Sequence, residues 1–175
     1  GYLAQAKPDE IDAVIEKLNN RDFEIEKRLM LKSGDFTALN DVVVKGVNCA
    51  RSSTLDLYIN DKKLCSYVAD GLIISTPTGS TAYSLSAGGP VVSPDVKCFL
   101  IIPICPHTLN ARPLVVPSSE NITVRTADKL LSVSIDGYET ENCVDKITIK
   151  TSSKKAYLAF LKDERFYSVL RNKLH

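Results

Sequence analysis

Tryptophan is absent from this chain of 175 residues, and only two histidines and one methionine occur. So few histidines make a zinc site improbable without a long-range assembly of ligands. The five cysteines are odd in number and never form a Cys-x-x-Cys pair, so no zinc ribbon or paired disulfide framework is predicted. We expect free thiols, no metal ligands and a reducing, cytoplasmic compartment.

The sequence also lacks a long apolar run and a surplus of charge of one sign. No hydrophobic stretch approaches the roughly 18 residues of a membrane helix, and no leader pattern is visible, so neither a membrane nor secretion is expected. Lys and Arg number 22 against 21 Asp and Glu, without a basic block, which disfavours a nucleic-acid partner. Because the chain begins with Gly1 and enters a helix directly, we expect it to be a piece of a longer protein.

The hydrophobic pattern predicts a mainly β fold, an antiparallel β-sandwich-like domain with a few short helices. Apolar residues at helical spacing predict a helix over 8–18, after which the period switches to two. About ten short strands separated by turn residues are typical of such a sandwich. The expected strands are 23–31, 42–44, a hairpin of 55–59 and 64–68, 97–104, 121–126, 130–135, 144–150 and 156–161.

We expect one domain over residues 1–175, with a helical entry segment at 1–20, a β domain at 22–161 and a terminal segment at 163–175. A short helix is predicted at 167–174 within that last segment. Five of the eight prolines fall between 90 and 113. They predict that this stretch is broken into short extended pieces instead of one central strand.

The most informative stretch is 70–84, in which a short apolar run gives way to a turn rich in hydroxyl side chains. Small side chains let a ligand approach the backbone, and hydroxyls both donate and accept hydrogen bonds. A helix over 82–87 would aim free N–H groups at a phosphate or ribose. The alternative, a plain connector with one capping hydroxyl, is less favoured because so many hydroxyls crowd the segment. The segment matches neither a P-loop nor a G-x-S-x-G elbow. Its candidate binding residues are Ser75, Thr78, Ser80, Thr81, Ala82, Tyr83 and Ser86.

Three other features have both a binding and a structural interpretation. Gly88 and Gly89 can end the helix or let backbone pack close to a ligand. Asn40 and Asp41 can read a ribose, although an Asx turn feeding a strand is the favoured interpretation from these residues alone. Asp136 can meet a ligand, but the Asp-Gly pair is typical of a hairpin, and that interpretation is slightly favoured.

A further candidate group contains Cys105 and His107. A lone histidine is more often structural than catalytic, and no base or metal partner for the cysteine is evident in the sequence. We therefore treat Cys105 as a candidate pocket wall.

In order along the chain, these residues resemble the C-terminal domain of NAD kinases. The Ser-Thr-Pro-Thr-Gly-Ser-Thr-Ala-Tyr run is highly specific, whereas Asn-Asp and Asp-Gly would mean little alone. The likeness covers nearly the whole chain, through residues 38–44, 70–84, 88–90, 103–113, 135–137 and 170–174.

The resemblance implies ATP-dependent phosphorylation of the adenosine ribose 2′-hydroxyl of NAD, giving NADP. It implies that Asn40 and Asp41 hold the ribose and adenine. It places Asp70, Cys105 and His107 at the nicotinamide end, in part from a neighbouring subunit of a dimer or tetramer. The adenine and phosphate side of the pocket would be lined by Thr78, Thr81, Ala82 and Tyr83.

The chain departs from the family's pattern in three ways. Asp41 stands where the family usually has Glu, and Tyr138, to which we assign no role, stands where Gln is common. The Gly-Gly-Asp-Gly motif is absent from these residues. In the family that motif lies in an N-terminal α/β domain and supplies the general base and ATP-phosphate contacts. We therefore expect no catalytic residue in this chain, and Mg²⁺ with ATP only in the full-length enzyme. The fragment is expected to bind NAD or NADP without catalysis.

Two other interpretations stay open. A lipid or sphingoid kinase relative would share the two-domain plan, but its binding face should be apolar rather than rich in hydroxyls. A non-catalytic nucleotide-binding module would be complete as it stands, and a Gly-Gly-Asp-Gly motif upstream would exclude it.

Overall fold

The computed structural model describes residues 8–47, 52–108, 110–126, 130–161 and 166–173. Its contacts divide the chain into two compact units, residues 1–28 with 156–175 and residues 29–155. We call them unit 1 and unit 2. Unit 2 is an antiparallel sandwich with few short helices, which confirms the predicted fold class.

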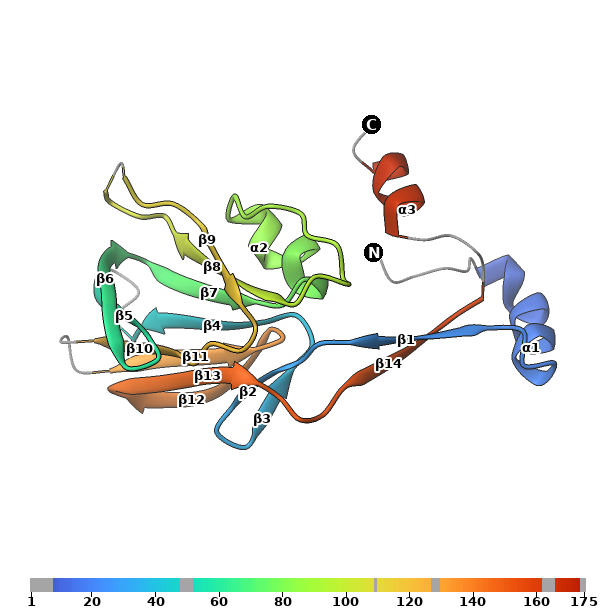
Figure 1. Ribbon diagram of the computed structural model, residues 1–175, viewed down its shortest axis with the longest axis horizontal. Helices are drawn as coiled ribbons and strands as arrows, with labels where there is room; N and C mark the ends of the chain where they lie inside the picture. The colour runs from blue at the N-terminus through green and yellow to red at the C-terminus, as the bar shows by residue number, and fades with distance from the viewer. Residues whose placement is uncertain (1–7, 48–51, 109, 127–129, 162–165, 174–175) are drawn as a thin grey trace. The chain divides into compact units, whose positions relative to one another are not determined.

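Two six-stranded antiparallel sheets form unit 2 (Figure 1). In spatial order the first sheet contains β3 (Phe36–Ala38), β2 (Leu31–Ser33), β13 (Lys146–Thr151), β10 (Ile122–Thr126), β5 (Ser53–Ile59) and β6 (Lys62–Ala69). The second contains β12 (Tyr138–Val144), β11 (Leu131–Ile135), β4 (Asp41–Gly46), β7 (Gly71–Ser75), β8 (Cys98–Ile104) and β9 (Leu114–Pro117).

Alternation places the core between these two sheets. Val42 and Val44 of β4 point into the main cluster of buried side chains, together with alternate residues of β5, β10 and β13. The opposite face of β4, β7 and β8 is also buried. There Val43, Ile73 and Ile102 pack with Ala87 and Val92 of the segment that follows β7. The central strands therefore read as continuous apolar runs because both of their faces are covered.

Turn residues fix two hairpins. Asn60 and Asp61 have φ values of 48° and 65° between β5 and β6, and Asp136 and Gly137 have 48° and 84° between β11 and β12. Positive φ at both central residues is the mark of the two-residue turn that matches strand twist. The predicted 55–59 and 64–68 hairpin is confirmed, with longer strands than expected.

Unit 1 contains a two-stranded ladder of β1 (Glu24–Arg28) and β14 (Ala156–Phe160). It also contains the 3₁₀ turn η1 (Pro8–Glu10) and the helices α1 (Ile11–Asn19) and α3 (Phe166–Lys173), as expected from the pattern at both ends of the chain. Among the described residues, no helix has the length and apolar content that a membrane crossing requires.

Two strand predictions are wrong. The single strand expected at 23–31 is divided between β1, which pairs with β14, and β2, which pairs with β13 and β3. The strand expected at 97–104 is present as β8, with Pro103 inside it. It is nevertheless a buried internal strand of its sheet, whereas the prolines predicted short extended pieces instead of one central strand. β9 pairs only with 98–101, so at Pro103 the missing N–H interrupts no ladder on that side. The strands β3, β7, β9 and β12 were not among the expected strands.

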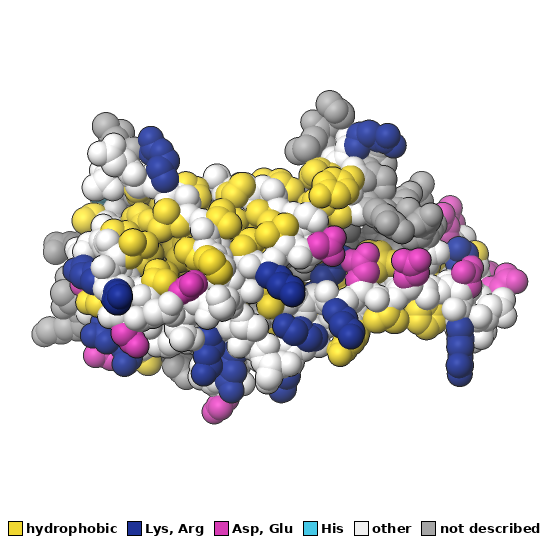
Figure 2. Space-filling view, viewed as in Figure 1, with side chains coloured by type: hydrophobic (Ala, Val, Ile, Leu, Met, Phe, Trp, Pro, Cys, Tyr) yellow, Lys and Arg dark blue, Asp and Glu magenta, His cyan; other side chains and the backbone are white. Residues whose placement is uncertain are grey.

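Hydrophobic side chains gather over β7, β8 and β9 in the view of Figure 2. β9 is an edge strand of its sheet, and its Val115 side chain is 56% exposed. Leu64 on the edge strand β6 of the other sheet is 54% exposed.

Candidate functional site

The predicted hydroxyl-rich turn begins where β7 ends. Residues 78–81 form the 3₁₀ turn η2 (Thr78–Thr81), and α2 (Tyr83–Ser86) follows. The helix expected at 82–87 is thus a single turn, too short for an appreciable dipole or an array of free N–H groups.

Most hydroxyls of this turn point inward. Ser75, Thr76 and Ser80 are fully buried. Thr76 Oγ1 donates to the Leu39 carbonyl at 2.6 Å and accepts from Gly79 N at 3.0 Å. Ser80 Oγ donates to the Pro77 carbonyl at 2.6 Å and accepts from Val92 N at 3.1 Å. These hydroxyls hold the turn together, and neither Ser75 nor Ser80 is among the residues that line the hollow described below.

The turn also holds the residues that precede β4. The Asn40 carbonyl accepts from Thr76 N at 2.9 Å and from Ser75 Oγ at 3.2 Å. A Cβ on Gly79 would lie 2.1 Å from that same oxygen, so only glycine allows the two segments to approach this closely. The turn therefore holds the carbonyls of Leu39 and Asn40.

Asp136 fixes the other side of this segment. Its carboxylate accepts the N–H groups of Leu39, Asn40 and Asp41 at 2.7, 2.7 and 3.1 Å. Asp136 N in turn donates to the Asp41 carbonyl at 3.0 Å. The carboxylate is thus already engaged by the backbone, and the hairpin interpretation of the Asp-Gly pair is correct. The backbone of Asn40 and Asp41 is clamped from two directions.

This clamped segment lines a hollow of about 390 Å³, which we call the β4 hollow. It lies on the face of β4 that carries Asp41, Val43 and Lys45. Its lining residues are Asn40, Asp41, Val43, Lys45, Ala82, Tyr83, Ser134, Asp136 and Gly137. The size suits a nucleoside-sized portion of a ligand.

The electrostatics of the β4 hollow centre on Asp41. Its side chain is 5% exposed, and burial together with the nearby Asp136 charge raises the pKa of Asp41 from 3.8 to about 6. Burial is the larger cause. No hydrogen bond to the Asp41 carboxylate or the Asn40 amide is found among the described residues. Both groups are thus available to a ligand's hydroxyls.

Five of the predicted site residues therefore meet at one hollow, namely Asn40, Asp41, Ala82, Tyr83 and Asp136. Thr78 and Thr81 are half-buried in η2 beside it, and Thr81 Oγ1 lies 3.4 Å from the Thr78 carbonyl. Ser86 is exposed on α2 and does not line the hollow.

Gly88 and Gly89 end α2 and do not line the β4 hollow. Gly88 has a φ of 84° and donates from its N–H to the Leu85 carbonyl at 3.0 Å. Gly89 N donates to the Ser84 carbonyl at 2.8 Å. Gly88 and Gly89 thus end the helix α2, which is one of the two interpretations given for them.

Asp70, Cys105 and His107 gather away from the β4 hollow, at the far end of β7 from Ser75. Asp70 N donates to the Ile104 carbonyl at 3.0 Å, and His107 N donates to the Val68 carbonyl at 2.8 Å. All three residues are exposed. The four residue steps of β7 separate this group from the turn by about 13 Å.

Sequence reasoning missed four lining residues of the β4 hollow, namely Lys45, Val43, Ser134 and Gly137. The signal for the first two was the alternation of β4, because residues two and four positions after Asp41 share its face. Among the described residues, no group of three or more His, Cys, Asp or Glu side chains is arranged to hold a metal.

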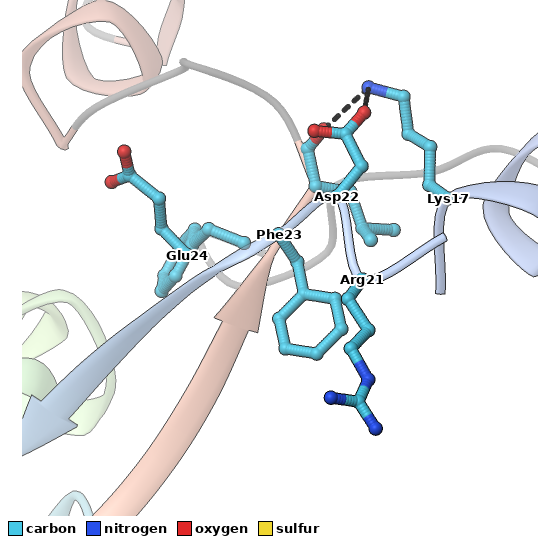
Figure 3. A pocket seen from close by; sticks show the side chains of 7 residues that line it. Lys17, Arg21, Asp22, Phe23 and Glu24 are labelled. Atoms are coloured by element: carbon cyan, nitrogen blue, oxygen red, sulfur yellow. Dashed lines mark hydrogen bonds and ion pairs between the residues drawn. The ribbon is translucent and has the colours of Figure 1, made fainter. Parts of the chain in front are cut away.

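A second hollow, of about 400 Å³, lies within unit 1 near the end of α1 (Figure 3). Lys17 and Asp22 point toward each other there, with Nζ 3.6 Å from Oδ2, and Lys17 Nζ donates to the Leu161 carbonyl at 2.8 Å. Arg21 points away from this pair. None of the predicted site residues lines this second hollow.

The family model for the ATP-NAD kinase C-terminal domain matches residues 39–161. A protein of Clostridium botulinum named NAD kinase is 38% identical over 185 residues, and one of Caldanaerobacter subterraneus is 38% identical over 187. Each alignment covers 99% of this chain, which spans 66% of the length of each relative.

Two solved structures are similar over 99% of the chain, each at 30% identity. A yeast NADH kinase complexed with NADH has a TM-score of 0.88, with 55% of its chain covered. An Archaeoglobus fulgidus NAD kinase in complex with ATP has a TM-score of 0.85, with 68% of its chain covered.

Proposed function

Because the chain belongs to the NAD kinase family through its C-terminal domain, we propose that it is the NAD-binding part of an enzyme that phosphorylates NAD to NADP. The observation that carries this proposal is the β4 hollow. There Asn40 and Asp41 line the hollow from a clamped backbone, and no hydrogen bond to either side chain is found in the described part of the chain. Such a rigid pair suits the hydroxyls of a ribose, because a carboxylate accepts from hydroxyls and an amide both donates and accepts.

In the proposed mode of binding, the adenosine ribose lies against Asn40 and Asp41. Ala82 and Tyr83 form a further wall of the same hollow. Tyr83 is 39% exposed, and its ring can offer an aromatic face to a base. Thr78 and Thr81 lie on η2, the turn that precedes this wall. Asp70, Cys105 and His107 are proposed at the nicotinamide end.

The proposed reaction is direct transfer of the ATP γ-phosphoryl group to the ribose 2′-hydroxyl. This chain contributes by holding and orienting that hydroxyl, which is a large part of the catalysis of phosphoryl transfer. The general base, the ATP-phosphate contacts and Mg²⁺ bound with ATP are proposed to belong to the rest of a full-length enzyme. The described residues contain no metal cluster to which we would assign Mg²⁺.

A cytoplasmic homo-oligomer, dimer or tetramer, remains part of this proposal. Its structural support is the exposed apolar surface of Leu64 and Val115 on two edge strands. Sedimentation of the full chain tests the oligomeric state directly.

Replacement of Tyr83 by Ala tests the site. We expect NAD affinity to fall about tenfold or more, because a base loses its aromatic wall, while the melting temperature changes little because the side chain is partly exposed. Calorimetry with NAD and a melting curve on parent and variant measure both quantities. Unchanged affinity would contradict the site assignment. An assay of the full-length enzyme with NAD, NADH, ATP and polyphosphate in turn tests the reaction and its donor.

A further inference from the structure

Lys45 is a lining residue of the β4 hollow to which neither the sequence motifs nor the family likeness assigns a role. It lies on β4 four positions after Asp41, so the two side chains share one face of the strand. Lys45 is half-buried, and its Nζ lies 5.9 Å from the centroid of the Tyr83 ring. The ring face attracts the ammonium group and holds it beside the hollow.

The ammonium group is available to a ligand. Although two carboxylates line the same hollow, no ion pair between Lys45 and Asp41 or Asp136 is found in the described part of the chain. Among the described lining residues, Lys45 is the one positively charged side chain. An anionic ligand group in the hollow is therefore attracted by one cation and repelled by two carboxylates.

The spacing along β4 sets the distance between an anion bound at Lys45 and a ribose bound at Asp41. Four residue steps put the Lys45 Cα about 13 Å from the Asp41 Cα. A lysine side chain spans about 6 Å, so Nζ can meet a group roughly one ribose away from the hydroxyls at Asp41. In a nucleotide, the group at that range is a phosphate.

We propose that Lys45, held over the Tyr83 ring, binds a phosphate group of the nucleotide in the β4 hollow. This inference rests on the proposed function and deepens it. The spacing favours the 5′-diphosphate of the dinucleotide as the source, because the 2′-phosphate of NADP is bonded directly to a ribose oxygen at Asp41. The test below separates these two sources. Both are phosphate esters that an ammonium group binds as a point charge.

The test is calorimetry of the full chain with four probes: adenosine, 5′-AMP, 2′-AMP and NAD. For Lys45→Met we expect adenosine affinity to be unchanged and the affinity for at least one AMP to fall about tenfold, which corresponds to about 1.4 kcal/mol. The AMP that is affected identifies the source of the phosphate. Added salt should weaken binding of that nucleotide to the parent more than to the variant.

Two control variants separate charge from folding. Lys45→Arg keeps a cation over the ring and should restore most of the affinity. Lys62→Met removes an exposed lysine of β6 outside the hollow and should leave every affinity and its salt dependence unchanged. Melting curves of all variants report folding.

Equal affinity of parent and Lys45→Met for both AMPs overturns the role of Lys45, and so does an equal loss for adenosine and the nucleotides. A folded parent that binds neither adenosine nor NAD overturns the proposed function itself. The two failures are therefore distinguishable.

Discussion

At the scale of single residues, Asp136 and Asp41 are neighbouring carboxylates with different tasks. The Asp136 carboxylate accepts hydrogen bonds from three backbone N–H groups and so sets the position of the segment that carries Asp41. Asp41 keeps its carboxylate for the hollow, at the cost of burial next to another negative charge. The first residue shapes the site, and the second faces the ligand.

Asp41→Asn should therefore stabilise the fold and weaken binding. In the folded chain the raised pKa favours the protonated form, so Asp41 contributes stability below about pH 4, and this contribution is lost as the pH rises through about 6. At pH 7 the ionised, buried carboxylate destabilises the folded state. We therefore expect Asn to raise the free energy of unfolding by about 1–2 kcal/mol. NAD affinity should fall because the neutral amide offers the ribose hydroxyls one acceptor oxygen where the carboxylate offers two.

Denaturant unfolding of parent and variant at pH 4.5 and pH 7 measures this effect. The gain should be larger at pH 7 than at pH 4.5. A gain that is equal at the two values, or larger at the lower one, would contradict the assignment of the raised pKa to Asp41.

At the scale of elements, the turn after β7 fixes neighbouring backbone segments more than it contacts a ligand. Its buried hydroxyls bond to the backbone carbonyls and N–H groups of 39–40, 77 and 92. Only Ala82 and Tyr83, at the end of the turn, line the β4 hollow. The hydroxyl-rich composition thus serves ligand binding by fixing Asn40 and Asp41, since a clamped site loses less freedom on binding.

Thr76→Val tests this bracing role, because valine keeps the shape and removes the hydroxyl. Two buried bonds are lost, one to the Leu39 carbonyl and one from Gly79 N. We expect a loss of about 1–3 kcal/mol in the free energy of unfolding and weaker NAD binding, although Thr76 does not line the hollow.

The matched control is Thr37→Val on β3, where a half-buried threonine stands in a strand. That exchange should change the free energy of unfolding by about 0.5 kcal/mol or less, as is common for substitutions away from buried hydrogen bonds. Equal stability of parent and Thr76→Val would show that the turn is not braced by this hydroxyl.

At the scale of the whole molecule, every residue that lines the β4 hollow belongs to unit 2. The core of the sandwich also lies within residues 29–155. A chain cut to 29–155 should therefore fold cooperatively and keep its affinity for NAD within about threefold, provided that the proposed site is the one that binds.

Calorimetry on the full chain and on the 29–155 chain, with a melting curve for each, measures this prediction. A folded 29–155 chain with greatly weakened NAD binding would show that unit 1 contributes to the site. Loss of the cooperative transition would instead show that β1 and β14 are needed for the sandwich to fold.

Local patterns in the sequence determined much of this protein. Alternating apolar residues determined the sandwich, because a strand buried on one face has a period of two. Asn60-Asp61 and Asp136-Gly137 determined two tight hairpins, because these residues tolerate positive φ. Motif order along the chain pointed to the family and to Asn40, Asp41, Ala82 and Tyr83, which do share one hollow.

Only the tertiary structure decided which polar groups face that hollow. The hydroxyls of the turn and the Asp136 carboxylate look equally available in the sequence. In the structure, backbone groups of 39–41 engage Asp136, Ser75 and Thr76, and backbone groups of 77 and 92 engage Ser80. The contact between Leu39 and Asp136 joins residues 97 positions apart, and no local pattern reports such a pairing. The contact between Lys45 of β4 and the Tyr83 ring of α2 likewise joins two separate elements. A buried polar group must find its partner wherever the fold brings one, so the division between brace and binding site is settled by packing.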